Sequence, residues 1–401
     1  MEIAGEKQGY NWIQLASVQV GGAVCLPVIL VGHELCRLWG FSAAVGAIFF
    51  GNVILAFLGA LSSEMTWKNK LTTSENAGLY FGKAGTCIVA LLLAISMCSW
   101  FAIQTQVVVH DITAFVPVDP RLVLFCISAL FAASLLFGFK GISKLADLSL
   151  PLLILTLAVV VGWSCIYSDT ALQFDIAKSI QPQAISMVMA LAMGVCMDMP
   201  TFFRMAKSKK ASQLASIVTF LIGMPIVELC GAVLYELTKT TSLLEIFRSP
   251  QITGWSVWVT LFFLFAAWTT NVCNLYSASM GMMSLFSKMK ERMAFICTGF
   301  FAVILSQIDL MSHLALVLDL LGVVLSSCFG VIVASFIANR PIADFVKIIS
   351  LFIAVAVGVV SMVFGLFLPS AVPVLDSALI AALSVFVIAR KVASSSSFRI
   401  C

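Results

Sequence analysis

A cluster of polar side chains interrupts one of the most apolar parts of the sequence. Between the segments LFFLFAA and MGMMSLF the chain reads WTTNVCNLYSAS. On a helix, Ala266, Thr270 and Asn274 share one face, because residues four apart are neighbours. Thr269 and Cys273 lie beside that face. Adjacent hydroxyls, together with free carbonyls from an unwound neighbouring helix, can replace the water around a small hard cation such as sodium, which prefers oxygen ligands.

The threonines also have a less specific explanation. Threonine hydroxyls in membrane helices often donate back to the carbonyl four residues earlier, and a Thr-Thr pair alone would favour that explanation. The amides of Asn271 and Asn274 are harder to explain in this way, because an exposed amide is costly in hydrocarbon. The combined pattern therefore favours a binding site.

A second candidate pair lies in the segment MCSWFAIQTQ. Trp100 and Gln104 are four residues apart and share a helical face. A large aromatic surface with an amide one turn away suits a flat ligand that forms hydrogen bonds. The alternative is a packing tryptophan beside a glutamine that bridges helices. Trp100 lies in the middle of its apolar run, away from the interface where tryptophans usually anchor.

Helix-breaking residues occur in two apolar runs. The first run carries Gly21 and Gly22 followed by Pro27, and the sixth carries Gly194 followed by Pro200. Interrupted helices at matching places in two halves of a chain are a sequence sign of a secondary transporter's binding site. The alternative is that Gly and Pro are simply common in membrane helices.

Several acidic residues lie in or near apolar runs, and we single out Asp198, Glu228 and Asp319. Acids within membrane helices are functional candidates by default, because burying a charge is expensive. Asp198 lies in the expected break of the sixth run. It could help to bind a cation, carry a proton, or accept hydrogen bonds from backbone amides that the break frees.

The composition identifies the solvent for most of the surface. The chain of 401 residues is 61% hydrophobic and only 10% charged, whereas a soluble domain carries about 25% charged residues. So few charges cannot cover a water-soluble protein of this length, so most of its surface must face lipid. A membrane-spanning helix needs about 20 apolar residues. About twelve runs approach this length: 12–34, 39–62, 85–112, 121–139, 145–167, 184–203, 213–237, 254–287, 293–308, 311–337, 345–368 and 372–389.

The connections between these runs are short, so we expect residues 1–401 to form a single integral membrane domain of α-helices. When the connections are assigned alternately to two sides, most of the 23 Lys and Arg residues fall on one side. The positive-inside rule makes that side cytoplasmic. We therefore expect a multi-pass protein of the inner (plasma) membrane, in contact with the lipid bilayer, with both termini in the cytoplasm.

Several classes of protein do not fit. The net charge of +4 is small, and the basic residues do not cluster with aromatics as a nucleic-acid surface requires. The 12 cysteines lie mostly in apolar runs and only three histidines are present, so we expect no disulfide or zinc framework. The sequence contains neither a metal-spaced His/Cys cluster nor a nucleophile elbow, so we expect neither an enzyme nor a cofactor. No obligate protein partner is evident.

Four motifs, in order along the chain, resemble one transporter family. WTTNVCNLYSASMG resembles the eighth-helix signature of the nucleobase:cation symporter-1 family, in particular that of its bacterial cytosine permeases. KLTTSENAGLYFGKAG (70–85) is similar to the family's second intracellular loop. TFFRMAKSKKA (201–211) is similar to the exit of its sixth helix, and GVIVASFIANR (330–340) to the end of its tenth.

This resemblance implies a LeuT-type fold, with two inverted five-helix repeats at about 12–167 and 184–337 and peripheral helices at about 345–389. It also implies uptake of a cytosine-like nucleobase or a related planar heterocycle by alternating access, coupled to sodium or, alternatively, to protons. In the family, sodium lies between the first and eighth helices. The sodium ligands that the resemblance implies are the hydroxyls of Thr269 and Thr270, the carbonyl of Ala266, and first-helix carbonyls near Ala16 and Gln19.

The resemblance also implies substrate contacts. Trp100 matches the third-helix aromatic that stacks on the substrate, and Gln104 matches an amide of the hydantoin-transporter branch. The substrate-binding residues that we expect are Gly21, Gly22, Trp100, Gln104, Gly194, Asp198, Asn271, Cys273 and Asn274.

The chain departs from the family pattern around the substrate. The Asn-Asp-Asn of the eighth helix becomes Asn271-Val272-Cys273, and the sixth-helix aromatic that covers the substrate becomes Ala192. The acid of the sixth-helix exit becomes Thr201. We therefore expect a retained scaffold and cation site, with a substrate pocket that differs from that of the cytosine permeases.

Two other functions remain open at this point. A transporter of the same fold for an amino acid or small amine would pair Asp198 with an ammonium group. A passive channel is less favoured, because the sequence offers neither a repeated carbonyl filter nor a ring of like charges.

Overall fold

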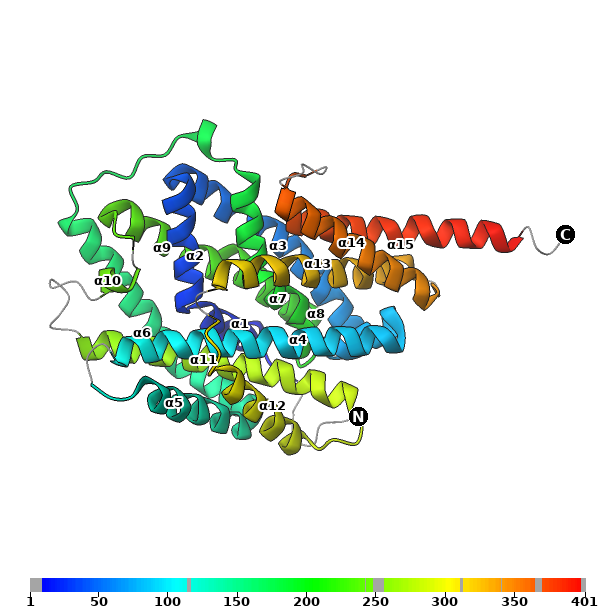
Figure 1. Cartoon of the computed structure of the whole chain (residues 1–401), viewed down its shortest axis with the longest axis horizontal. Helices are drawn as coiled ribbons and strands as arrows, with labels where there is room; N and C mark the ends of the chain where they lie inside the picture. The colour runs from blue at the N-terminus through cyan, green and yellow to red at the C-terminus, as the bar shows by residue number, and fades with distance from the viewer. Residues whose placement is uncertain are drawn as a thin grey trace.

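The protein is a bundle of long helices in the computed structural model, which describes residues 9–113, 117–241, 243–247, 256–310, 313–339, 341–364 and 370–397 (Figure 1). Its elements are α1 (Trp12–Ala23), α2 (Leu26–Trp39), α3 (Phe41–Asn69), α4 (Thr73–Thr113), α5 (Pro120–Ser134), the 3₁₀ turn η1 (Leu135–Phe137), α6 (Gly138–Tyr167), the 3₁₀ turn η2 (Ile176–Lys178), α7 (Pro182–Phe203), α8 (Lys209–Val218), the π-helical turn η3 (Thr219–Gly223), α9 (Met224–Thr238), α10 (Leu243–Phe247), α11 (Ser256–Leu285), α12 (Glu291–Leu305), α13 (Leu314–Ala338), α14 (Asp344–Phe364) and α15 (Pro373–Ser397). The described residues contain no strand, only one isolated bridge between Tyr10 and Ala206.

Large apolar side chains cover the outside of the bundle. Phe57, Phe137, Phe300 and Phe352 are each exposed over more than half of their surface. Such a surface is stable in hydrocarbon rather than in water. A helix also satisfies its own backbone hydrogen bonds, as lipid requires. The all-helical membrane fold therefore agrees with the expectation from composition.

The number of membrane spans is less simple than the expected twelve. Among the described residues, nine helices are long and apolar enough to cross a membrane, or ten if the bent pair α1 and α2 is one span. The segment Pro120–Tyr167 counts once in that number, although 48 helical residues would extend about 72 Å and the hydrocarbon core is only about 30 Å thick. Gly138, with φ +62°, separates its two helices. α12 has 15 residues and falls below the length limit.

The first apolar run is broken, as its glycines and proline indicated. α1 and α2 meet at an angle of 60°, and Val24 and Cys25 lie between them. Pro27 lies in the first turn of α2, where its missing N–H costs no helical hydrogen bond.

The expected break in the sixth run is absent from the structure. α7 continues without interruption from Pro182 to Phe203 and passes through both Gly194 and Pro200. Pro200 lies close to the end of the helix, so its effect is confined to the last turn. The chain turns only after Phe203, in the connection to α8.

The long helices pack in two groups around the middle of the molecule (Figure 1). α11 packs along α4, and α5 packs against α12 beside this pair. α7 packs between α3 and α13, and α13, α14 and α15 form a layer of their own. α4 begins, and α11 and α15 end, toward the right-hand end of Figure 1.

Glycines let α2 and α9 approach until their backbones touch. A Cβ on Gly32 would lie 1.8 Å from the carbonyl oxygen of Glu228, and one on Gly231 would lie 1.9 Å from that of Ile29. Only glycine fits at these two positions. α2 and α9 therefore form a tightly packed pair.

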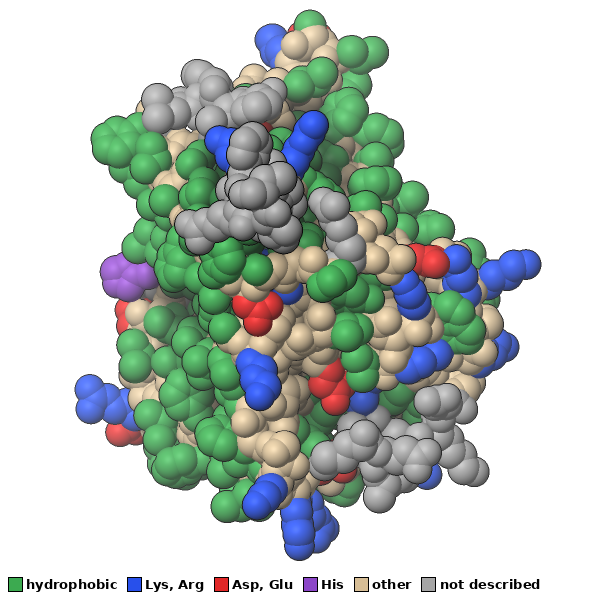
Figure 2. Space-filling model, turned by 90° about the vertical axis from the view of Figure 1, so that its right-hand side faces the viewer, with side chains coloured by type: hydrophobic (Ala, Val, Ile, Leu, Met, Phe, Trp, Pro, Cys, Tyr) green, Lys and Arg blue, Asp and Glu red, His purple; other side chains and the backbone are tan. Residues whose placement is uncertain are grey.

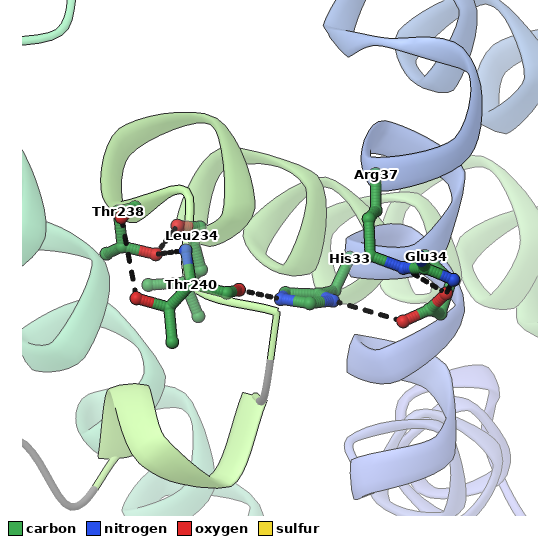
Figure 3. A network of polar contacts seen from close by, with 6 residues as sticks. All are labelled: His33, Glu34, Arg37, Leu234, Thr238 and Thr240. Atoms are coloured by element: carbon green, nitrogen blue, oxygen red, sulfur yellow. Dashed lines mark hydrogen bonds and ion pairs between the residues drawn. The ribbon is translucent and has the colours of Figure 1, made fainter.

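A polar network extends this pair at one end (Figure 3). His33 points from α2 toward the segment after α9, and its Nε2 lies 2.9 Å from the carbonyl oxygen of Thr240. The His33 ring packs edge-on against Tyr235. On α2 itself, Arg37 pairs with Glu34 at 2.6 Å. The segment after α9 is thereby attached to α2.

Candidate substrate and cation site

A cluster of oxygen atoms lies where the end of α1 meets α11. The hydroxyl of Thr269 lies 3.2 Å from the carbonyl oxygen of Gly21, and that of Thr270 lies 2.8 Å from the carbonyl oxygen of Gly22. Both hydroxyls also approach the carbonyl oxygen of Ala266, at 3.0 and 2.9 Å. The cluster therefore joins two hydroxyl and three carbonyl oxygens from two different helices.

The end of α1 explains why these carbonyls are available. The last carbonyls of a helix have no partner in the next turn. The N–H of Val24 still donates to Val20, but the N–H of Cys25 donates to Ala23 rather than to Gly21. The Gly21 and Gly22 carbonyls accept hydrogen bonds from α11 instead.

The first-helix carbonyls in this cluster differ from those that the resemblance implied. Ala16 and Gln19 lie inside α1, where their carbonyls accept the regular bonds from residues four positions later. The oxygens beside the hydroxyls belong to Gly21 and Gly22, close to the break. The carbonyls differ because they depend on the residue at which α1 ends, and the sequence did not predict that residue.

The oxygen set fits a small hard cation. Hydroxyl and carbonyl oxygens are the ligands that such ions prefer. Within the part of the chain that the structure describes, no group of three or more His, Cys, Asp or Glu side chains could hold a metal ion. A set made of hydroxyl and carbonyl oxygens is compatible with an alkali cation.

A cavity adjoins the oxygen cluster. It has a volume of ≈ 60 Å³ and is bounded by the break between α1 and α2 and by α4, α7, α9 and α11. Its lining residues are Gly22, Ala23, Cys25, Pro27, Val28, Met97, Trp100, Gln104, Leu191, Gly194, Val195, Met224, Thr270 and Asn274. Gly22 and Thr270 therefore belong to both the cavity and the oxygen cluster.

Two amide atoms on the cavity residues are buried without a partner. Neither Gln104 Oε1 nor Asn274 Nδ2 finds a hydrogen-bond partner among the described residues. A buried polar atom left unpaired costs about 1–3 kcal/mol. Two residues that line the cavity with Trp100 thus carry an unpaired acceptor on α4 and an unpaired donor on α11. Small-molecule pockets usually measure about 300–1,000 Å³, so this cavity is contracted.

Asn271 does not line this cavity, although the sequence placed it in the site. Its Nδ2 donates to Thr105 Oγ1 at 3.0 Å and approaches the carbonyl of Phe101 at 3.3 Å. Asn271 therefore fastens α11 to α4. Cys273, two residues further along α11, is half-buried and is also absent from the lining.

Comparisons with known proteins identify the family of the chain. A sequence family described as "Permease for cytosine/purines, uracil, thiamine, allantoin" matches residues 2–350. This chain belongs to that family, the nucleobase:cation symporter-1 family. The cytosine permease of Escherichia coli K12 is 22% identical over 302 residues, which cover 73% of this chain and 70% of the relative.

Solved transporters show the same fold. Mhp1, a nucleobase-cation-symport-1 transporter solved in a closed conformation with bromovinylhydantoin bound, superposes with a TM-score of 0.79 at 16% identity, covering 98% of this chain and 96% of its own. A Na⁺-coupled sialic acid symporter superposes with a TM-score of 0.72 at 13% identity, covering 96% and 90% of the two chains. The chain is thus a multi-pass membrane protein of the LeuT-type fold and a secondary transporter rather than an enzyme.

Asp198 does not line the cavity of this transporter. Its side chain is 2% exposed. One carboxylate oxygen accepts a hydrogen bond from Thr201 Oγ1 at 2.7 Å, and the other accepts one from Ser277 Oγ. The sequence placed Asp198 near a helix break with free backbone amides. Hydroxyl groups are its partners instead.

Glu228 and Asp319, the other two acids that the sequence analysis singled out, lie elsewhere. Glu228 on α9 is fully buried and accepts a hydrogen bond from Asn52 Nδ2 of α3 at 2.6 Å. Asp319 lines a separate cavity of ≈ 330 Å³ between α2, α7 and the α13–α15 layer. Neither lines the cavity that contains Trp100.

Sequence reasoning missed the hydroxyls around Asp198. Thr201 follows it by three positions and Ser277 follows Asn274 by three, so the helical spacing did carry a signal. The register of α7 also differs from the expectation. Leu191, Gly194 and Val195 line the cavity, whereas Ala192 does not.

Proposed function

We propose that the chain takes up a planar, nucleobase-like heterocycle together with sodium by alternating access. One observation carries the proposal: Gly22 and Thr270 contribute both to the oxygen cluster and to the cavity with the unpaired amide atoms. Anything that orders these two residues changes both sites together. A shared wall is a direct physical route for coupling between two ligands.

Each cavity residue then has a role that follows from its chemistry. Trp100 offers a flat face for stacking on an aromatic ring. The unpaired oxygen of Gln104 accepts a hydrogen bond from a ring N–H, and the Asn274 amide donates to a ring carbonyl or nitrogen. Nucleobases and hydantoins present neighbouring donors and acceptors of this kind.

The oxygen cluster supports sodium over a proton as the coupling ion. Its members are hydroxyls and carbonyls, which do not gain or lose a net proton near neutral pH. A sodium ion between α1 and α11 would be held by Thr269, Thr270, Ala266, Gly21 and Gly22. The ion would supply a positive charge that draws the end of α1 toward α11.

The amine-transporter alternative loses its main support. It required Asp198 to pair with an ammonium group, but both carboxylate oxygens of Asp198 already accept hydrogen bonds from hydroxyl groups. None of the residues that line the cavity, as far as the structure describes them, is acidic.

The distribution of basic residues supports an orientation. Lys and Arg side chains gather on the end of the molecule viewed in Figure 2, toward which α11 and α15 end. We propose that this end faces the cytoplasm of a cell whose inner membrane holds the protein. The chain ends themselves, 1–8 and 398–401, lie outside the described residues.

The test is uptake by the purified protein in proteoliposomes. Labelled cytosine would be supplied with and without an inward sodium gradient and competed with purines, pyrimidines, hydantoins and amino acids. We expect gradient-driven uptake that one class of heterocycle blocks. Uptake that ignores the sodium gradient would overturn the coupling, and competition by amino acids alone would overturn the substrate class.

A further inference from the structure

Below the cavity, α7 carries a stripe of residues on one face. Gly194, Asp198 and Thr201 follow each other at intervals of four and three, which places them on one side of the helix. Gly194 lines the cavity, and the next two residues are buried beyond it. The stripe therefore leads from the cavity toward the end where α7 joins α8.

α11 carries a matching stripe. Thr270, Asn274 and Ser277 have the same spacing. The first two line the cavity, and Ser277 is 3% exposed one turn beyond it. The two stripes run in the same direction away from the cavity.

The stripes meet in a buried hydroxyl–carboxylate cluster, which we call the Asp198 clamp and define as Asp198, Thr201, Ser277 and Thr73. Asp198 accepts hydrogen bonds from Thr201 of its own helix and from Ser277 of α11. Thr73, at the start of α4, lies 3.1 Å from Thr201 Oγ1. The clamp thus joins α7, α11 and α4 directly below the cavity.

An aromatic layer lies next to the clamp. The Tyr276 ring packs against Phe139 of α6, Phe202 of α7 and Phe295 of α12, with centroids 5.9, 5.7 and 6.2 Å apart. Arg204 donates to the Tyr276 hydroxyl at 3.0 Å. The layer therefore joins α6, α7, α11 and α12 beside the clamp.

The segment before α1 adds a strap across the same side. The N–H groups of Gly9 and Tyr10 donate to the carbonyl of Met205, and the N–H of Lys207 donates to the carbonyl of Tyr10. These bonds hold Gly9 and Tyr10, just before α1, against the connection between α7 and α8. A ligand in the cavity could leave on this side only if α7 moved away from α11.

We infer that Asp198 is the lock of a gate on this side of the cavity: its bond to Ser277 keeps α7 against α11 while the gate is shut and must break before the ligand leaves. The inference rests on the proposed function in one respect: it assumes that the transported ligand leaves the cavity past the clamp and the aromatic layer. The residue positions the helices and does not touch the ligand.

A carboxylate held by hydroxyls suits a gate that opens repeatedly. Hydrogen bonds to a charged group are stronger than neutral ones while the cluster is dry. When the helices separate, water replaces the hydroxyl groups around the carboxylate. The closed and open states can therefore lie close in free energy, as alternating access requires.

The test uses Cys273, which lies four residues before Ser277 and next to Asn274, as a reporter. Purified protein of known orientation in proteoliposomes would be treated with a membrane-impermeant thiol reagent on one side at a time. Labelling of Cys273 would be read by mass spectrometry, with Cys273→Ser as the control for peptide assignment.

Asp198→Asn and Ser277→Ala each remove a charge-assisted bond. A bond of this kind corresponds to a population change of about tenfold or more. We expect faster labelling of Cys273 from the side of the Asp198 clamp and slower labelling from the opposite side. General loosening of the fold would raise labelling from both sides, so opposite changes identify a gate.

Glu228→Gln is the matched control, because it neutralises another fully buried membrane carboxylate that a side-chain amide holds. We expect wild-type labelling of Cys273 in this variant. The double variant Asp198→Asn, Ser277→Ala is expected to change labelling no more than the stronger single variant, because both remove the same bond.

Wild-type labelling in both Asp198→Asn and Ser277→Ala would overturn the inference, as would equal increases from both sides. If Asp198→Asn does not fold, Ser277→Ala and Thr201→Val carry the test on their own. Labelling needs no substrate, so a protein that takes up no heterocycle but still shows the sided change would refute the proposed function and leave the gate intact.

Discussion

At the scale of single residues, Thr270 shows how much the sequence could predict. Its place beside Thr269 and Asn274 indicated a polar face on a membrane helix, and the structure places its hydroxyl in the oxygen cluster and its side chain at the cavity. The simpler explanation of the threonine pair also holds, because the Thr270 hydroxyl donates to the carbonyl of Ala266 four residues earlier. Its role as a cation ligand stays a prediction. The partners on α1 depended on where that helix ends, which is a tertiary property.

The oxygen cluster predicts a specific defect in sodium use. Thr269→Ala with Thr270→Ala removes both hydroxyls, and we expect the sodium concentration for half-maximal uptake to rise about tenfold. Sodium titration of uptake at fixed substrate measures this. Thr66→Ala is the control, because the Thr66 hydroxyl donates only back along its own helix, to Ser62 at 2.7 Å. Unchanged sodium dependence in the double variant would contradict the assignment.

Gln104 predicts an effect on substrate alone. Gln104→Leu keeps the volume but removes the buried acceptor, so a ligand N–H would lose its partner and affinity should fall about tenfold. Binding of the heterocycle identified by competition, measured by calorimetry, tests this. The sodium dependence of the variant should remain that of the wild type. A variant that binds the heterocycle normally would exclude Gln104 from the contact.

At the scale of elements, the glycine and proline pattern was right for one helix and wrong for another. Gly21 and Gly22 do precede a break and Pro27 follows it, whereas Gly194 and Pro200 lie in a continuous helix. Pro27 lies in the first turn of a helix and Pro200 lies in the last turn of one, and local sequence does not distinguish these two cases. The polar start of α4, before the kink at Gly82, was also missed because it contains no apolar run.

The contact between α2 and α9 predicts strong sensitivity to a single methyl group. Gly231→Ala would force a Cβ within 1.9 Å of the Ile29 carbonyl oxygen, so we expect a loss of about 1–3 kcal/mol. The melting temperature in detergent measures it. Gly162→Ala on α6 is the control, because nothing lies within 4 Å of its added Cβ. Equal stability of the two variants would show that α2 and α9 can separate freely.

At the scale of the whole molecule, the sequence predicted the membrane class and the family from composition and four motifs. The repeat boundaries at about 12–167 and 184–337 stay a prediction. The span number could not be settled by length, because α5 and α6 join almost without a gap while α12 is short. Helix length reflects local bilayer contacts that apolar runs measure only coarsely.

The proposed orientation predicts opposite labelling of two exposed connections. Lys288→Cys lies between α11 and α12, and Arg121→Cys lies at the start of α5. In intact cells an impermeant thiol reagent should label Arg121→Cys above the parent protein and leave Lys288→Cys at the parent level. Labelling of Lys288→Cys but not of Arg121→Cys would contradict the proposed orientation and support the opposite one.

The close contact of α2 with α9 has a consequence for inhibition. Without side chains between them at Gly32 and Gly231, the two helices have little room to slide, and the bond from His33 carries this stiffness to Thr240 (Figure 3). α2 also forms part of the cavity wall through Pro27 and Val28. An antibody fragment that binds the segment around Thr240 would therefore restrict the movement of α2 without entering the cavity. Transport could be blocked by a binder that bears no resemblance to a nucleobase.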